Sequence, residues 1–203
     1  MELLITMTIG LIMLTALSST FLMQRKVYDV QEQIVEMVQN VRAAMDMMTR
    51  EIRMAGYDPT NLAGAGIVNA TSNSINFTLD ITDDTDTGTP DEDTDDSNEN
   101  ITYSLYTEDS IQKLGRKSKV TANNQPVAEN IDTLEFTYTL KNGTVIAPPT
   151  NPTIAQILNI VKVDIKITAK TTKPDSDYTH PTDGDHYRRY TLTSVITPRN
   201  LNL

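Results

Sequence analysis

An uncharged run of 21 residues, from Leu3 to Met23, constrains this chain more than any other feature of its sequence. As an α-helix the run would be about 31 Å long, close to the thickness of the hydrocarbon core of a bilayer. A signal-peptide core is usually shorter and follows a positively charged segment, and a buried helix of a soluble protein rarely avoids charge over this length. The run therefore predicts a transmembrane helix over residues 1–24.

The next segment, residues 25–56, is predicted to continue the same helix as an amphipathic half. Apolar residues recur at three- and four-residue steps, at Val27, Val30, Ile34, Met37, Val41, Met45, Met48 and Ile52. Gly56 is a typical residue at a helix C-terminus, and Pro59 prevents the helix from continuing. We expect the apolar stripe of this half to pack on the remainder of the chain.

Residues 57–203 contain segments in which polar and apolar residues alternate, as they do in strands with one covered face. These predicted strands are residues 74–79, 101–106, 111–116, 134–140, 160–168 and 190–197. The stripe on the amphipathic half is the obvious cover for their apolar faces. The sequence thus predicts the α+β class, with a long N-terminal helix packed on an antiparallel β-sheet in a globular domain over residues 57–203.

The acidity of the chain is concentrated in one loop, residues 80–100. This loop holds ten of the 27 acidic residues and no basic residue, so the remaining 17 acidic residues balance the 17 Lys and Arg. Ca²⁺ prefers about six to eight oxygen ligands, and closely spaced carboxylates supply them. The alternating spacing makes Asp91, Asp93, Asp95 and Glu99 candidate Ca²⁺ ligands. The alternative is a solvated surface loop that binds no ion.

Other function classes find little support in the sequence. The chain has no basic stripe, so nucleic acid is not a predicted partner. It has no cysteine, and its two histidines, His180 and His186, lie in one polar loop. It also lacks a Gly-x-Ser-x-Gly turn and a phosphate-binding loop. The sequence therefore predicts a protein that is not an enzyme and has no cofactor other than the candidate Ca²⁺.

Several stretches of the chain carry a family resemblance. They are the apolar run that opens with Glu2, Leu3 and Leu4, the helix ending Arg50-Glu51-Ile52-Arg53-Met54-Ala55-Gly56-Tyr57, and residues 127–138 and 198–201. Together they resemble type IV pilins and, more narrowly, PilW-type minor pilins and the related J-type pseudopilins of type II secretion. The resemblance implies a pilin-like fold and a subunit that works by assembly.

The resemblance also implies how the subunit reaches the pilus and what Glu2 does there. The apolar helix would wait in the inner membrane with the globular domain exported, and would then pack with the helices of other pilins in an extracellular pilus. In the family, the glutamate matched by Glu2 pairs with the N-terminal amine of the adjacent subunit. That glutamate is the fifth residue after a basic leader ending in Gly, whereas Glu2 is the second residue here. Leader cleavage and N-methylation therefore cannot be read from this chain.

Three functions remain open from the sequence. The first is a minor pilin that takes part in the initiation, assembly or tip of a type IV pilus. The second is a type II secretion pseudopilin. The third is a single-pass anchored protein that binds calcium or a partner without polymerising; in such a protein, Arg25 and Lys26 would place this end of the span on the cytoplasmic side, the reverse of the pilin orientation.

Overall fold

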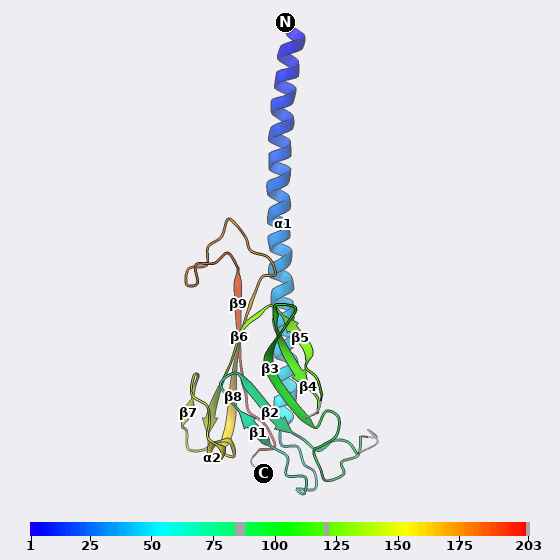
Figure 1. The fold of residues 1–203 in the computed structure, drawn as a ribbon, viewed down its shortest axis with the longest axis vertical. Helices are drawn as coiled ribbons and strands as arrows, with labels where there is room; N and C mark the ends of the chain where they lie inside the picture. Colours follow the sequence, from blue (N-terminus) through cyan, green and yellow to red (C-terminus); the bar gives the residue numbers. More distant parts are fainter. Residues whose placement is uncertain (84–87, 120–121, 202–203) are drawn as a thin grey trace. The chain divides into compact units, whose positions relative to one another are not determined.

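The computed structural model describes residues 1–83, 88–119 and 122–201 (Figure 1). These residues divide into two compact units, Met1–Glu36 with Thr171–Arg188, and Met37–Lys170 with Arg189–Leu203. One helix, α1 (Glu2–Met54), contributes residues to both units. The prediction of a single helix that passes from the apolar run into the amphipathic half is therefore confirmed.

The first unit combines the apolar part of α1 with the loop 171–188. The residues that the structure describes include one helix long and apolar enough to cross a membrane, and none of its apolar window is buried. The loop is fastened to the same helix by polar contacts. Lys26 Nζ donates to Asp177 Oδ2 at 2.6 Å, and the backbone N–H of Lys173 donates to Gln33 Oε1 at 2.8 Å. These contacts lie next to the charged end of the apolar run.

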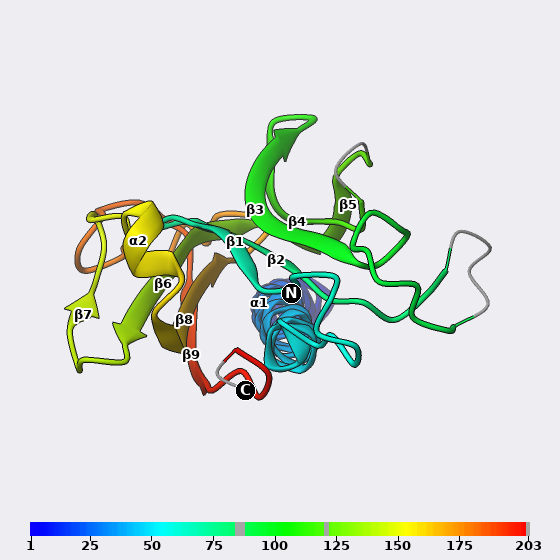
Figure 2. The same cartoon turned by 90° about the horizontal axis from the view of Figure 1, so that it is seen from below.

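The second unit holds two antiparallel sheets, so the predicted α+β class is confirmed, with the strands divided between two sheets where the sequence suggested one. The first sheet has the strand order β1 (Ile67–Ala70), β2 (Ser74–Thr78), β3 (Asn100–Glu108), β4 (Ile111–Lys117) and β5 (Gln125–Glu129). The second has the order β7 (Val145–Ile146), β6 (Ile131–Leu140), β8 (Ile160–Lys170) and β9 (Arg189–Ile196). A short helix, α2 (Ile154–Ile157), precedes β8. Figure 2 looks along α1 and shows the strands of both sheets beside its C-terminal end.

The strands in which polar and apolar residues alternate also alternate between exposed and buried side chains. In β6, Leu134, Phe136 and Tyr138 are buried and the residues between them are partly exposed. The antiparallel register places Phe136 opposite Ile165 of β8, which is buried as well. Because successive side chains of a strand point to opposite faces, these two central strands turn one apolar face to the core.

The buried stripe of α1 is shorter than the sequence predicts. Val27 is 47% exposed, and Val30 and Ile34 are half-buried. Full burial begins at Met37 and continues through Val41, Ala44, Met45, Met48 and Ile52. All of these buried residues belong to the second unit, so only the last part of the amphipathic half covers the sheets.

A partly buried ion pair joins the end of α1 to the first sheet. The Glu51 carboxylate accepts hydrogen bonds from the Tyr103 hydroxyl at 2.6 Å and from Arg116 Nε at 3.0 Å. Burial of Tyr103 and its hydrogen bond to Glu51 raise the pKa of the tyrosine well above its usual value. On the other sheet, Thr49 Oγ1 lies 3.4 Å from Ser194 Oγ. The helix is therefore tied to both sheets by polar side chains as well as by its apolar stripe.

We expect Arg116→Met to lower the free energy of unfolding by about 2 kcal/mol, because it leaves the Glu51 carboxylate partly buried without its cation. Thermal unfolding of the full-length chain in detergent, followed by circular dichroism, measures the change. Lys166→Met is the matched control, since the Lys166–Glu135 pair is more exposed than the Glu51–Arg116 pair and contributes less than about 1 kcal/mol. An equal loss in both variants would contradict the role given to the Glu51–Arg116 pair.

Candidate functional site

The apolar run presents an uncovered surface along its whole length. Glu2 is the first residue of α1 and is exposed, as are all the large apolar residues between it and Arg25. Phe21, for example, is 64% exposed. A carboxylate in the first turn favours the helix because it lies at the positive end of the helix dipole. No part of the run's apolar window is buried by the described residues of the chain, and an exposed apolar surface of this extent is typical of a site of contact with lipid or with another protein.

The helix ending that carries the family resemblance is a tightly packed junction. Gly56 has φ +79°, a backbone conformation that costs other residues about 1–2 kcal/mol. Its N–H donates to the Thr78 carbonyl at 2.9 Å, and a Cβ at this position would lie 2.8 Å from Leu201 Cδ2 and 3.3 Å from the Asn200 backbone. The prediction that Gly56 ends the helix is confirmed, and glycine is required there for two separate reasons.

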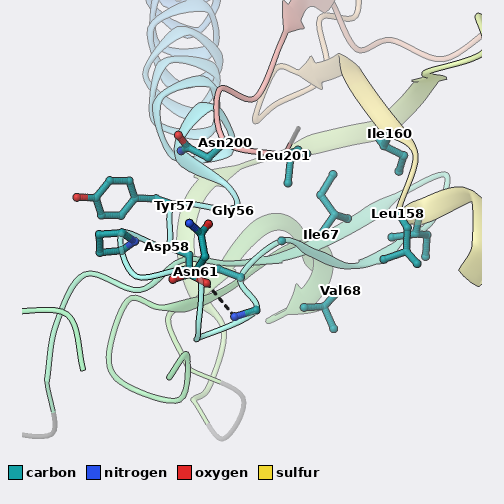
Figure 3. A pocket seen from close by; sticks show the side chains of 15 residues that line it. Gly56, Tyr57, Asp58, Asn61, Ile67, Val68, Leu158, Ile160, Asn200 and Leu201 are labelled. Carbon is teal, nitrogen blue, oxygen red and sulfur yellow. Dashed lines mark hydrogen bonds between the residues drawn. The ribbon is translucent and has the colours of Figure 1, made fainter. Parts of the chain in front are cut away.

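Another family-like segment, residues 198–201, binds to this same junction. The Arg199 N–H donates to the Arg53 carbonyl at 3.1 Å, and the Asn200 side-chain amide donates to the Met54 carbonyl at 3.3 Å. The last carbonyls of a helix lack partners within the helix, so these bonds cap its C-terminus. Figure 3 shows Asn200 and Leu201 beside Gly56. Two segments that share one resemblance but are far apart in sequence thus form one structural feature.

A cleft of about 580 Å³ lies next to the junction (Figure 3). Its walls come from the junction, from β1 and from the start of β8, with Tyr57, Ile67 and Ile160 among them. Asp58 is the one acidic side chain among its described lining residues, and its carboxylate accepts the Gly64 N–H at 2.9 Å and the Leu62 N–H at 3.3 Å. That carboxylate therefore holds the loop after the helix in shape. Because it is the single acidic side chain among the described lining residues, the cleft offers no pair of carboxylates for acid–base catalysis.

The acidic loop is closed by Glu99, which lies at its end. Glu99 is fully buried, and its Oε1 accepts the backbone N–H groups of Ile81 and Thr82, both at 2.7 Å. Its Oε2 lies 3.4 Å from the N–H of Asp96. A carboxylate that accepts several backbone hydrogen bonds holds its loop in one shape. Glu99, which the sequence proposed as a Ca²⁺ ligand, therefore joins the two ends of the loop.

A group of carboxylates gathers inside the closed loop. Asp91, Asp93 and Asp96 place one oxygen each within 4.8 Å of one another. Asp95, another residue proposed from the sequence, is exposed and does not belong to this group, although its N–H donates to Asp93 Oδ1 at 3.0 Å. Positions 84–87 of the predicted acidic loop lie outside the described residues. The structure therefore brings together two of the four proposed ligands and adds Asp96.

Asp80 is a buried carboxylate that sequence reasoning missed. It is 0% exposed, and its only donors among the described residues are the backbone N–H groups of Glu92 and Asp91, which do not reach full hydrogen-bonding geometry. Burial raises the pKa of its carboxyl and the Glu99 charge adds to the increase, while the nearby backbone N–H groups of Glu92 and Asp91 act in the opposite direction. These neighbours place the Asp80 carboxylate beside the turn that carries the acidic group. No sequence signal marked it, because it directly follows a strand like any surface Asp.

In the loop of the first unit, several charged side chains pair within the loop or with Lys26 of α1. Arg188 donates to Asp175 Oδ2 at 2.9 Å, and this hydrogen bond holds the pKa of Asp175 below its usual value. His180 Nδ1 lies 2.9 Å from Asp183 Oδ2, and His186 contacts the Tyr178 carbonyl. The two histidines thus have separate partners within the loop, and they do not belong to the group of carboxylates that could hold a metal.

Comparisons with known proteins agree with this architecture. No curated protein matches the sequence significantly. A type IV-like pilin from Thermus thermophilus has a similar fold, with a TM-score of 0.50 over 81% of this chain and 97% of that chain, at 10% sequence identity. A family model described as prepilin peptidase-dependent protein B matches residues 30–190, which include most of the amphipathic half, the whole first sheet, and the second sheet up to the start of β9. The long helix packed on antiparallel sheets is thus a pilin-like fold, and the chain belongs to the prepilin peptidase-dependent protein B family.

Proposed function

We propose that this chain is a minor pilin that takes part in initiating or capping a type IV pilus. The observation that carries the proposal is the uncovered apolar run of α1, which is long enough to span a bilayer and is followed by a folded pilin-like domain. In the membrane this surface is covered by lipid. In a filament it is covered by the helices of other pilins, and small residues such as Gly10 and Ala16 suit close helix packing.

The mechanism is assembly without catalysis. The helix resides in the inner membrane with the second unit exported, and is then extracted into the growing extracellular filament. Glu2 would enter an apolar helix core, where an unpaired carboxylate is costly. A pair between Glu2 and the N-terminal amine of the adjacent subunit would remove that cost and set the axial position of each subunit.

The test is a strain that lacks this chain, in which surface filaments are counted by electron microscopy and the secreted proteins are compared with those of the parent. If the chain is a minor pilin, filaments should disappear from the strain that lacks it and return when the full-length chain is expressed. Loss of secretion with filaments retained would instead identify a type II secretion pseudopilin. If neither property changes, the chain does not polymerise and is a plain membrane-anchored protein.

The runner-up, the pseudopilin, differs from a minor pilin in the subunits it contacts. A photo-activated cross-linker placed at an exposed position of the apolar run, such as Phe21, would capture the neighbouring helix in intact membranes. Cross-links to pilus subunits support the proposal, and cross-links to secretion pseudopilins support the alternative.

A further inference from the structure

The edges of the two sheets are not protected equally. An edge strand is normally kept from pairing with other chains by short length, a bulge, Pro or charge. β1 has four residues and a register shift, β7 has two residues, and β5 contains Pro126 and pairs with a register shift. β9 has eight residues, and all of them pair with β8 in one unbroken register. Among the described residues, β9 is therefore the one long and regular edge.

β9 also lacks the charges that usually guard such an edge. From Tyr190 to Ile196 it has no charged residue and no Pro. Its one charge, Arg189, is the first residue of the strand and donates from Nε to Asp132 Oδ2 at 2.8 Å. On the outer face of the sheet Val195 is 62% exposed. Nothing in the strand itself therefore repels another strand laid beside it.

The register shows which backbone groups of β9 point away from the sheet. The Lys170 N–H donates to the Asn130 carbonyl, just before β6, at 2.9 Å, so Thr168, two residues earlier in β8, also turns its backbone groups to β6. Thr168 lies opposite Thr191, and their hydroxyls are 2.9 Å apart, as in the closer, non-hydrogen-bonded pairs of an antiparallel ladder. Thr191 and every second residue after it thus direct N–H and C=O outward. Among the described residues, no backbone hydrogen bond joins β9 to a segment other than β8.

The helix contacts β9 from the inner face. Thr49 Oγ1 lies 3.4 Å from Ser194 Oγ, and Ser194 shares its face of the strand with the buried Ile196. Tyr190 and Leu192 lie on this same face and are only half-buried. A strand added beside β9 would cover them with its own inward side chains and extend the apolar layer.

We infer that β9 binds an extended segment of another protein, which joins the second sheet as its fifth strand. In this mode of recognition the main-chain hydrogen bonds supply affinity and the alternate side chains supply specificity. The segment that fits has apolar residues beside Tyr190 and Leu192, and small β-branched residues beside Thr191 and Thr193. The surface is separate from the helix packing of the proposed function, since neither Glu2 nor the apolar run contributes to it.

The charges around β9 favour an acidic end on the bound segment. From Arg188 to Leu203 the sequence has three Arg and no acidic residue, although the net charge of the chain is −10. Two of these Arg pair with aspartates. Arg199, just beyond the end of β9, is exposed and forms no ion pair with a described residue. A carboxylate at the N-terminal end of an antiparallel segment would meet this cation.

The test uses the full-length chain in detergent and a fluorescein-labelled peptide of alternating Val and Thr with one N-terminal Glu. Methyl groups on every second amide nitrogen leave the peptide one edge that can pair, so it cannot stack on itself. We expect saturable binding by fluorescence anisotropy, and a loss of at least about tenfold when the remaining amides are methylated as well. No saturable binding at about 1 mM peptide, or equal binding of the two peptides, would overturn the inference.

Thr193→Pro removes one outward N–H and spares the ladder to β8, because proline is tolerated on an edge strand where its nitrogen faces solvent. The variant should bind the peptide at least about tenfold more weakly, with a Tm close to that of the parent. Thr193→Val is the matched control, since it keeps both the N–H and the branched shape, and it should bind like the parent. Equal affinities of the two variants would show that the peptide does not pair with the backbone of β9.

A cysteine reaction locates the bound peptide without changing the backbone. The chain has no cysteine, so Val195→Cys places a single thiol on β9, and Val145→Cys places one on β7 at the opposite edge of the same sheet. The two valines are 62% and 59% exposed. A bromoacetyl group on the peptide should alkylate the thiol on β9 at least about tenfold faster, because binding holds the two groups together. Equal rates would place the peptide elsewhere and refute the assignment to β9.

Discussion

Glu2→Ala is expected to reduce surface filaments to the level of a strain that lacks the chain altogether. The substitution removes the only charged side chain ahead of Arg25, at the first residue of α1. If Glu2 pairs with the amine of the adjacent subunit inside the filament, the change leaves that amine buried without a partner. Breaking such a pair costs about 3 kcal/mol or more, which lowers an association constant by more than about 100-fold. Electron microscopy of cells that express equal amounts of each variant measures the effect.

Two controls make the Glu2 experiment specific. Glu32→Ala makes the same change at an exposed position of the same helix beyond the apolar run, and it should leave the filament number unchanged. Membrane fractionation should recover the Glu2→Ala chain in the inner membrane, because removing a charge does not weaken insertion. Normal numbers of filaments from a correctly inserted Glu2→Ala chain would contradict the assembly role of Glu2 and favour a plain anchor.

Gly56→Val is expected to be the most destabilising single change in the second unit. Valine at φ +79° is strained by about 2 kcal/mol, and its side chain would also displace Leu201 and the Asn200 backbone. Overpacking of this kind adds about 1–3 kcal/mol, so the total loss is about 4 kcal/mol. For a chain of this size the loss corresponds to a fall in Tm of roughly 8–16 °C, measurable by circular dichroism in detergent.

Gly143→Val separates the two causes. Gly143 has φ +84°, almost the same as Gly56, but an added Cβ would meet nothing within 4 Å. This variant carries the backbone strain alone and should lose only about 2 kcal/mol. Equal losses at Gly56 and Gly143 would show that the contact with residues 200–201 has no energetic importance.

The sequence predicted the parts of the fold that rest on local periodicity. The apolar run and the stripe after it predicted one helix, and the structure has one from Glu2 to Met54. Alternation identified long strands such as β6 and β8, because each carries several apolar residues on one face. Strand β1 has four residues with buried ends and an exposed middle, and β7 has two residues, so neither shows a period that could be read.

The remaining features depend on contacts between distant residues. Whether the strands form one sheet or two is decided by pairing, as when β6 pairs with β8 and β7 and not with β5. In the acidic loop, regular spacing suggested Asp95 as a ligand, but the structure places Asp96 beside Asp91 and Asp93 instead. Asp80 could not be found from spacing at all, because only the folded chain brings it next to that turn.

The cap on α1 also closes a long stretch of chain. The Met54 carbonyl and the Asn200 side chain that binds it are 146 residues apart in the sequence, and every strand of both sheets lies between them. A chain interrupted before Pro198 would have both sheets but an uncapped helix end with the space beside Gly56 left open. The junction between helix and domain therefore depends on the last residues of the domain as much as on the helix itself, since residues 199–201 supply the cap.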